Sequence, residues 1–307
     1  MGLARRILDF GCGIGILTTF FARRHPESRF VGVDRSSASI DYASRRAAEL
    51  RLDNVEFHRI DVDREAVSGS YDLVLATHAL LQAEQDPGIP SDRWESFGRG
   101  EDLARQTAFE LRTGLAPRLD RLLTTLADQS RMIVFEKTRL LARRVPFQRA
   151  LAARGLRLLE PPEPVRYALV EEVADDGPLY VLGRPVQASD IDWSERPEEV
   201  EADTVNLDSL RGRAGSGEDP LYENHTAAAQ VLWQSLPDRR VMKEFTKEGQ
   251  DGRQLHAELG TTRDLFYLYV ANTFDQRQLL LIEAARAGVL DCYFADIEGD
   301  HTRGTPS

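Results

Sequence analysis

The chain opens on a short apolar run that ends in three closely spaced glycines. Residues 7–10 are apolar apart from Asp9, and Gly11, Gly13 and Gly15 follow before a helical pattern begins. Glycine adopts positive φ angles and lets a ligand approach the backbone where a Cβ would clash. The free N–H groups at the start of the next helix favour an anionic group. The sequence therefore predicts a strand, a glycine-rich turn open to a ligand, and a helix.

Strand-like and helical segments alternate over the first 185 residues or so. We expect strands at 6–10, 30–34, 54–60, 71–76 and 131–136, and helices at 17–24, 36–50, 103–126 (interrupted at Gly114 and Pro117) and 147–154. This alternation predicts a mostly parallel, doubly wound sheet. The runs 167–173 and 179–182 flank Asp175-Asp176-Gly177, a hairpin signal that adds one antiparallel strand.

Two acidic residues narrow the class of ligand. Asp34 ends the second expected strand, where a carboxylate can accept both hydroxyls of a ribose. Nicotinamide enzymes use Gly-x-Gly-x-x-Gly, whereas position 16 here is Ile. Asp9 stands two residues before the first glycine, where it would repel a pyrophosphate and suits a ligand with an ammonium group.

The pattern Asp-x-Gly-x-Gly-x-Gly resembles motif I of the class I S-adenosylmethionine-dependent methyltransferases. Residues 54–61, ending in Asp61, resemble the third strand of that family, and residues 71–82 resemble its fourth-strand motif. The resemblance covers roughly residues 6–185 and leaves the last 120 or so unmatched. It implies an α/β fold with a doubly wound, mostly parallel seven-stranded Rossmann-like sheet that includes one antiparallel strand.

The resemblance also implies S-adenosyl-L-methionine as cofactor. The residues that it places on the cofactor are Asp9, Gly11, Gly13, Gly15, Asp34, Arg35, Asp61, Val62 and Thr77. In the family's pattern Asp9 and the glycines serve the methionine end, and Asp34 holds the ribose hydroxyls. Asp61 reads the adenine amine, Arg35 and Val62 flank the ring, and Thr77 lines the mouth near the sulfonium.

Two side chains are candidates for a general base. His78 follows the fourth expected strand and Glu136 ends the fifth, so both fall at the carboxyl edge of the sheet, where ligands bind. A base is needed only when the acceptor carries a proton. His78 is the candidate catalytic residue, the alternative being a helix-start residue, and Glu136 is weaker because Lys137 can pair with it. No metal site is expected, since the six histidines are scattered without ligand spacing.

Charge and motif content bear on the acceptor. Lys and Arg total 39 against 50 Asp and Glu, a net charge of −11 that disfavours nucleic acid. The basic patch Arg139–Arg149 is interpreted as a solvated helix face. We therefore expect methyl transfer to oxygen or nitrogen of a small-molecule acceptor. Two alternatives are a non-catalytic scaffold with this fold, and a protein or RNA methyltransferase that docks its substrate on the basic patch and the C-terminal module.

The composition divides the chain into four parts. We expect a methyltransferase domain at 1–186, an acidic linker at 187–219, a small α+β module at 220–297 and a tail at 298–307. In the module the patterns predict helices at 226–236 and 276–287 and strands at 241–247, 254–259 and 265–271. The oligomeric state is not indicated.

The start of the chain carries a further expectation. The family places helices before the first strand as a cofactor lid, and Met1–Arg5 is too short to form them. We expect an N-terminally shortened form, with weaker cofactor binding than an extended one. The alternative is that the acidic linker or the C-terminal module covers the cofactor. The first residues do not match a signal peptide, no run is long enough to cross a membrane, and two cysteines fit a reducing compartment, so a cytoplasmic location is expected.

Overall fold

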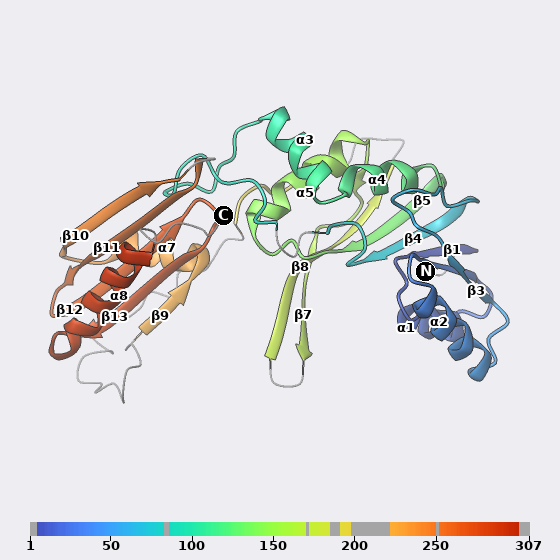
Figure 1. The fold of residues 1–307 in the computed structure, drawn as a ribbon, viewed down its shortest axis with the longest axis horizontal. Coiled ribbons are helices and arrows are strands. Elements are labelled where there is room, and N and C mark those ends of the chain that lie inside the picture. Colours follow the sequence, from blue (N-terminus) through green and yellow to red (C-terminus); the bar gives the residue numbers. More distant parts are fainter. Residues whose placement is uncertain are drawn as a thin grey trace. The chain divides into compact units, whose positions relative to one another are not determined.

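A computed structural model describes residues 5–82, 86–169, 172–184, 191–197, 222–249 and 252–300. The chain forms two compact units (Figure 1). The first comprises residues 1–89 and 102–194, and the second comprises residues 90–101 and 195–307. Most of the predicted acidic linker, residues 187–219, lies outside the described residues, as does the tail beyond residue 300.

The first unit alternates strands and helices around one sheet. Its strands are β1 (Arg6–Phe10), β2 (Arg29–Asp34), β3 (Val55–Arg59), β4 (Tyr71–Thr77), β5 (Leu126–Phe135), β6 (Arg157–Leu158), β7 (Glu163–Leu169) and β8 (Glu172–Gly183). Its helices are α1 (Ile16–Arg24), α2 (Ser37–Glu49), α3 (Leu103–Arg112), α4 (Leu115–Leu123) and α5 (Leu141–Ala153). The sheet order is β3-β2-β1-β4-β5-β8-β6, with β1 to β5 parallel and β8 antiparallel to β5. The predicted doubly wound, mostly parallel fold is confirmed.

Apolar residues on both faces of the central strands bury this sheet. Ile7 and Leu8 of β1 are fully buried, as parallel strands between two helical layers require. On α4, Leu115, Leu119 and Leu122 recur at helical spacing and join the same core. This packing holds the carboxyl ends of β1, β2 and β4 next to one another at one edge of the sheet.

The antiparallel part of the sheet differs from the predicted hairpin. Asp175-Asp176-Gly177 lies inside β8 and does not form the turn. The β7–β8 register shifts between Val165 and Arg166, opposite Gly177, whose φ is +128°, so the signal marks a bulge. Leu169 pairs with Glu172, and the two residues between them lie outside the described ranges. Among the described strands β7 pairs with β8 alone, and it is an eighth strand beyond the seven expected.

Two of the predicted helices differ from the helices in the structure. Of the two expected interruptions, only Gly114 breaks the helix, with φ +67°, because Pro117 falls in the first turn of α4, where a missing N–H costs little. α5 begins at Leu141 and contains Pro146, and the carbonyl that this proline leaves free, Ala142 O, accepts from the N–H of Ile89 at 2.8 Å.

The predicted solvated face at Arg139–Arg149 is wrong, because α5 is packed into the core. Arg144 and Gln148 are buried along with the apolar residues of the helix. The Arg144 guanidinium donates to the carbonyls of Thr138 and Arg139, at 3.1 and 2.9 Å. From the sequence alone, an arginine that is buried and donates to nearby carbonyls cannot be distinguished from an exposed arginine.

The second unit is an antiparallel sheet with helices. Its elements are β9 (Tyr222–His225), α7 (Thr226–Ser235), β10 (Arg239–Glu248), β11 (Gln254–Thr262), β12 (Leu265–Asn272), β13 (Arg277–Glu283), the 3₁₀ turn η2 (Ala284–Arg286) and α8 (Ala287–Asp300), in sheet order β10-β11-β12-β13-β9. Trp233 of α7 packs with Tyr267 and Tyr269, whereas Phe294 of α8 packs with Leu268 and Leu280. Alternate residues of one strand thus face different helices, as strand periodicity requires.

The predicted helix at 276–287 is wrong. Residues 277–283 form β13, whose alternating leucines fill both apolar clusters, and helix α8 begins only at Ala287. β9 was not predicted. None of the helices in the described ranges is both long and apolar enough to cross a bilayer.

Residues 90–101 belong to the second unit, although they lie between β4 and α3 in the sequence. The Trp94 ring stacks on His256 with a centroid distance of 3.7 Å and an interplanar angle of 4°. Arg277 donates to the carbonyls of Trp94 and Ser96, and Arg99 pairs with Asp275 at 2.5 Å in a buried position. The second unit is therefore built from two separate stretches of the chain.

Replacing Trp94 by alanine is expected to lower the stability of the second unit by about 2–3 kcal/mol, because the His256 ring loses its stacking partner. Faster amide hydrogen exchange in β11 would report this loss. Trp94→Phe keeps an aromatic face and is expected to lose less than half as much. Unchanged exchange in both variants would show that residues 90–101 do not stabilise the sheet.

Candidate functional site

The three glycines of the first turn share a positive φ and differ in what surrounds them. Gly11, Gly13 and Gly15 have φ angles of +75°, +53° and +72°, which only glycine adopts without strain. A Cβ at Gly11 would lie 2.4 Å from Ala79 Cβ, and one at Gly15 would lie 2.8 Å from Ala43 Cβ. A Cβ at Gly13 meets nothing within 4 Å. Gly15 therefore serves packing against α2, whereas Gly11 lets two turns approach each other.

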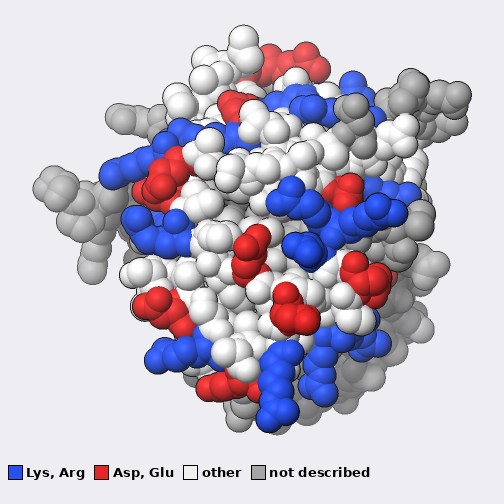
Figure 2. Space-filling model, turned by 90° about the vertical axis from the view of Figure 1, so that its right-hand side faces the viewer, with Lys and Arg blue, Asp and Glu red and all other residues white. Residues whose placement is uncertain are grey.

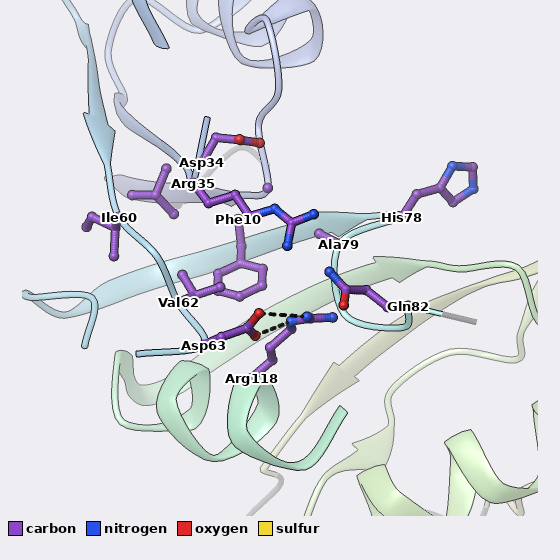
Figure 3. Close-up of a pocket in the computed structure, with 12 residues that line it drawn as sticks. Phe10, Asp34, Arg35, Ile60, Val62, Asp63, His78, Ala79, Gln82 and Arg118 are labelled. Atoms are coloured by element: carbon purple, nitrogen blue, oxygen red, sulfur yellow. Dashed lines mark hydrogen bonds and ion pairs between the residues drawn. The ribbon is translucent and has the colours of Figure 1, made fainter. Parts of the chain in front are cut away.

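A cavity of about 310 Å³ opens at the carboxyl ends of β1, β2 and β4 (Figure 3). Its lining is Phe10, Gly11, Val33, Asp34, Arg35, Ile60, Val62, Asp63, His78, Ala79, Gln82 and Arg118. Ile60 and Val62 lie at one end of this group and His78 at the other (Figure 3). Four of the predicted cofactor residues line the cavity, together with His78. Asp9, Gly13, Gly15, Asp61 and Thr77 do not.

Asp34 is held in place on the cavity wall by backbone groups. Its Oδ2 accepts from the N–H of Gly13 at 3.0 Å, and its Oδ1 accepts from the N–H of Ser36 at 2.8 Å. Ser36 also caps α2, since its hydroxyl accepts from Ser39 N. Each carboxylate oxygen has a second lone pair, so Asp34 can accept two more hydrogen bonds from a ligand.

Asp9 lies beneath the glycine turn and only 4% of it is exposed. Its Oδ2 accepts from the Thr18 hydroxyl at 2.5 Å, which ties β1 to α1. Burial raises the pKa of Asp9 to about 6, an effect that the Thr18 hydrogen bond opposes. The Asp9 side chain does not line the cavity.

After β3, the side chain that lines the cavity is Asp63 and not the predicted Asp61. Asp61 pairs with Arg64 at 3.7 Å and accepts from the N–H of Asp63, and its side chain does not line the cavity. Asp63 does line it, and its two oxygens accept from Nε and a terminal nitrogen of Arg118 at 2.8 and 3.1 Å (Figure 3). This guanidinium holds the pKa of Asp63 below its usual range. Neither member of this pair was predicted from the sequence.

Glu136 shapes the turn after β4 rather than lining the cavity. It is 1% exposed, and its Oε1 accepts from the N–H groups of Ala79 and Leu80 at 2.8 and 2.7 Å. Its Oε2 accepts from Leu81 N at 3.4 Å. Burial raises the pKa of Glu136 to about 7 against these three hydrogen bonds. Glu136 is a positioning residue, and the expected pairing with Lys137 does not explain its place.

His78 is held by β5 and by the β7–β8 hairpin. Its φ of +51° is unusual for a residue with a side chain, and its N–H donates to Phe135 O at 2.8 Å. The ring stacks on Phe135, and Nε2 lies 3.3 Å from Asp176 Oδ2. Residues 79–82 are not helical, so the alternative of a helix-start residue is wrong.

The surface carries charges of both signs. Figure 2 shows Lys and Arg interspersed with Asp and Glu over the face that it presents. Among the described residues of that face, neither sign forms a continuous field.

Comparisons with known proteins agree with this geometry. Residues 7–91 match a family model described as a methyltransferase domain. A trans-aconitate 2-methyltransferase from Deinococcus radiodurans is 32% identical over 101 residues, 33% of this chain and 37% of that protein. A tRNA (guanine-N(7)-)-methyltransferase from Rubrobacter xylanophilus is 48% identical over 50 residues, 16% of this chain and 22% of that protein.

Among solved structures, the S-adenosylmethionine-dependent methyltransferase SibL in its apo form shares 17% identity, with a TM-score of 0.39. The match covers 60% of this chain and 51% of that one. The curated relatives are matched over about a third of their length or less. Residues 7–91 of the first unit are therefore similar to a methyltransferase domain.

Proposed function

We propose that the chain is an S-adenosylmethionine-dependent methyltransferase that acts on oxygen or nitrogen of a small-molecule acceptor. The observation that carries this proposal is the cavity at the ends of β1, β2 and β4, with Asp34 fixed on its wall. The residues present fit the cofactor. Asp34 has lone pairs for two ribose hydroxyls, and Ile60 and Val62 offer an apolar wall to an adenine ring. Gly11 borders the cavity without a side chain.

When bound, the cofactor supplies a methyl group already activated on a sulfonium. The protein's part is then to hold the acceptor in line with that methyl group and to exclude water. In our proposal Asp34 and the apolar wall fix the nucleoside end, and Arg35 and Val62 flank the base. The glycine turn, supported by Asp9, receives the methionine end, and the site of transfer falls toward Thr77 and His78. Asp61, whose side chain pairs with Arg64 and does not line the cavity, would have to turn toward the adenine to accept from its amine.

A small acceptor is supported by the charge of the chain. The net charge of −11 and the mixed surface of Figure 2 disfavour a phosphate backbone. One matched relative is named as a tRNA methyltransferase, so RNA is included in the acceptor test below.

Calorimetry with S-adenosylhomocysteine on the full chain tests the cofactor assignment. We expect Asp34→Ala to weaken binding by about 10- to 100-fold, because hydrogen bonds to a charged group are lost. Asp53→Ala removes an exposed carboxylate away from the cavity and is the matched control. Equal affinity in the two variants, or no binding by folded wild-type protein at millimolar ligand, would contradict the proposal.

The acceptor class is tested by transfer of a radiolabelled methyl group. The acceptors are small phenols, aliphatic alcohols, amines, carboxylic acids and bulk tRNA. We expect labelled small-molecule product and unlabelled tRNA. Label in tRNA alone would reject the small-molecule acceptor and favour the RNA alternative. Label in none of them, with binding of the cofactor intact, would favour the scaffold alternative.

A further inference from the structure

The β7–β8 hairpin brings two side chains to the end of the cavity that His78 occupies. Figure 1 shows this hairpin projecting from the sheet of the first unit. Asp176 of β8 lies with its Oδ2 3.3 Å from His78 Nε2. The same Oδ2 accepts a hydrogen bond from the Tyr167 hydroxyl of β7. The three side chains form a connected row that runs from the hairpin to the cavity lining.

We propose that this row is a proton-accepting unit and that the acceptor it serves is a hydroxyl group. His78 accepts the proton, and Asp176 and Tyr167 are positioning residues. The inference rests on the proposed methyl transfer and deepens it, because it selects among the acceptor classes. A carboxylate acceptor is ionised near neutral pH and needs no base, whereas a hydroxyl must lose its proton as it reacts.

The contact of the His78 ring with Asp176 determines which ring nitrogen can accept a proton. Because Asp176 Oδ2 lies 3.3 Å from Nε2, its negative charge favours the tautomer with the proton on Nε2, which leaves the lone pair on Nδ1. Nδ1 takes the proton of the acceptor hydroxyl, and the oxygen's electron pair forms the new O–C bond. The electron pair of the broken C–S bond stays on sulfur. The imidazolium that results is paired with the Asp176 carboxylate, so no further reactant is needed.

The backbone of His78 supports a functional role for its position. A residue with a side chain at φ +51° carries strain, and such strain persists only where the surroundings fix it. Here Phe135 does so twice, since its carbonyl accepts from His78 N and its ring stacks on the imidazole. The ring thus contacts β5 through Phe135 on one face and β8 through Asp176 at Nε2.

The charged groups around the ring act in opposite directions. Burial lowers the pKa of His78, Asp176 raises it and Lys137 lowers it. The hydrogen bond to Asp176 raises the pKa of the Tyr167 hydroxyl, which therefore stays protonated as a donor. Burial is the largest of these effects, so the pKa of His78 lies below its usual value, which favours the neutral imidazole that can accept a proton.

The decisive experiment is an NMR titration of the histidine rings in the full chain. His78→Asn assigns the signal, and asparagine tolerates positive φ, so the turn is kept. In Asp176→Asn we expect the pKa of His78 to fall, because the carboxylate that stabilises the imidazolium is gone. Glu163→Gln makes the same change at an exposed position of the same hairpin and is expected to leave the titration unchanged. An identical His78 titration in both variants would overturn the proposal.

A transfer assay with phenols and aliphatic alcohols provides the second readout. We expect Asp176→Asn to slow transfer by about 10- to 100-fold and His78→Asn by about 10²- to 10⁴-fold, with the KM for the cofactor unchanged. Tyr167→Phe is expected to have a smaller effect in the same direction. Transfer to a hydroxyl at the wild-type rate in His78→Asn, or transfer to carboxylic acids alone, would overturn the proposal.

The proposed methyl transfer and the proposed proton-accepting row are contradicted by different results. Loss of S-adenosylhomocysteine binding in wild-type protein would remove the proposed function, and the titration would still report whether Asp176 controls the ring. Binding within about twofold of wild type in all four variants shows that the cofactor half of the site is intact. If none of the probes accepts a methyl group while the cofactor binds, the scaffold alternative is favoured and the proton-accepting role of the row is rejected.

Discussion

Glu136→Ala is expected to lower the free energy of unfolding of the first unit by about 3–5 kcal/mol at pH 5. Three N–H groups of the turn after β4 lose their acceptor, and those of Leu80 and Leu81 are buried. Each buried donor left unpaired costs roughly 1–3 kcal/mol. Because His78 and Ala79 stand on this turn and line the cavity, cofactor binding should weaken with it.

The pH dependence of this effect has a defined sign. The pKa of Glu136 is raised from 4.5 to about 7 in the folded protein, so the folded state binds the proton more tightly than the unfolded state does. The stabilisation is complete below pH 4.5 and is lost as the pH rises through about 7, by an amount of about 3 kcal/mol. Asp9, raised to about 6, acts in the same direction over a lower range. Wild-type stability is therefore expected to fall from pH 5 to pH 8.

Urea unfolding at several pH values, with exchange of the Leu80 amide as a local readout, measures both effects. Glu136→Gln is the matched control, since its carbonyl can still accept from Ala79 and Leu80 but does not titrate. We expect it to cost about 1 kcal/mol and to flatten the fall in stability between pH 5 and pH 8. A pH profile parallel to wild type in Glu136→Gln would show that another group causes the fall.

Local sequence signals predicted the parts of the fold that depend on neighbouring residues. The apolar runs of β1, β2 and β4 and the glycine turn were placed to within a residue or two, because burial between two helical layers demands continuous apolar strands. Asp34 was predicted because it is the last residue of β2, and ligands bind at the edge of the sheet where the carboxyl ends of the parallel strands meet.

The missed features depend on contacts between distant parts of the chain. Arg118 reaches Asp63 across 55 residues, and nothing in its own helix distinguishes it from a surface arginine. Residues 90–101 pack within the second unit through Trp94 and Arg99. These contacts join distant parts of the chain, so no hydrophobic periodicity in the sequence predicts them. Asp176 was predicted to lie in a turn, because the sequence Asp-Asp-Gly is typical of tight turns and is also compatible with a β-bulge. Only the pairing register of β7 against β8 distinguishes the turn from the bulge.

Gly11→Ala is expected to weaken S-adenosylhomocysteine binding by at least about 100-fold and to destabilise the first unit by about 3 kcal/mol. Its Cβ would lie 2.4 Å from Ala79 Cβ and 3.4 Å from Ala79 Cα, so the two turns must move apart. Both residues line the cavity, and the movement therefore deforms the binding site itself. The positive φ adds roughly 1–2 kcal/mol of strain.

Gly13→Ala separates these two causes. Gly13 has a φ of +53°, close to that of Gly11, but a Cβ there meets no protein atom within 4 Å. We expect it to lose only the strain energy, about 1–2 kcal/mol, in urea unfolding. The excess loss in Gly11→Ala then measures the clash with Ala79, and Ala79→Gly in the Gly11→Ala background should recover most of it. Equal unfolding energies for the two alanine variants would show that backbone strain alone governs the turn, and that the approach of Gly11 to Ala79 does not shape the cavity.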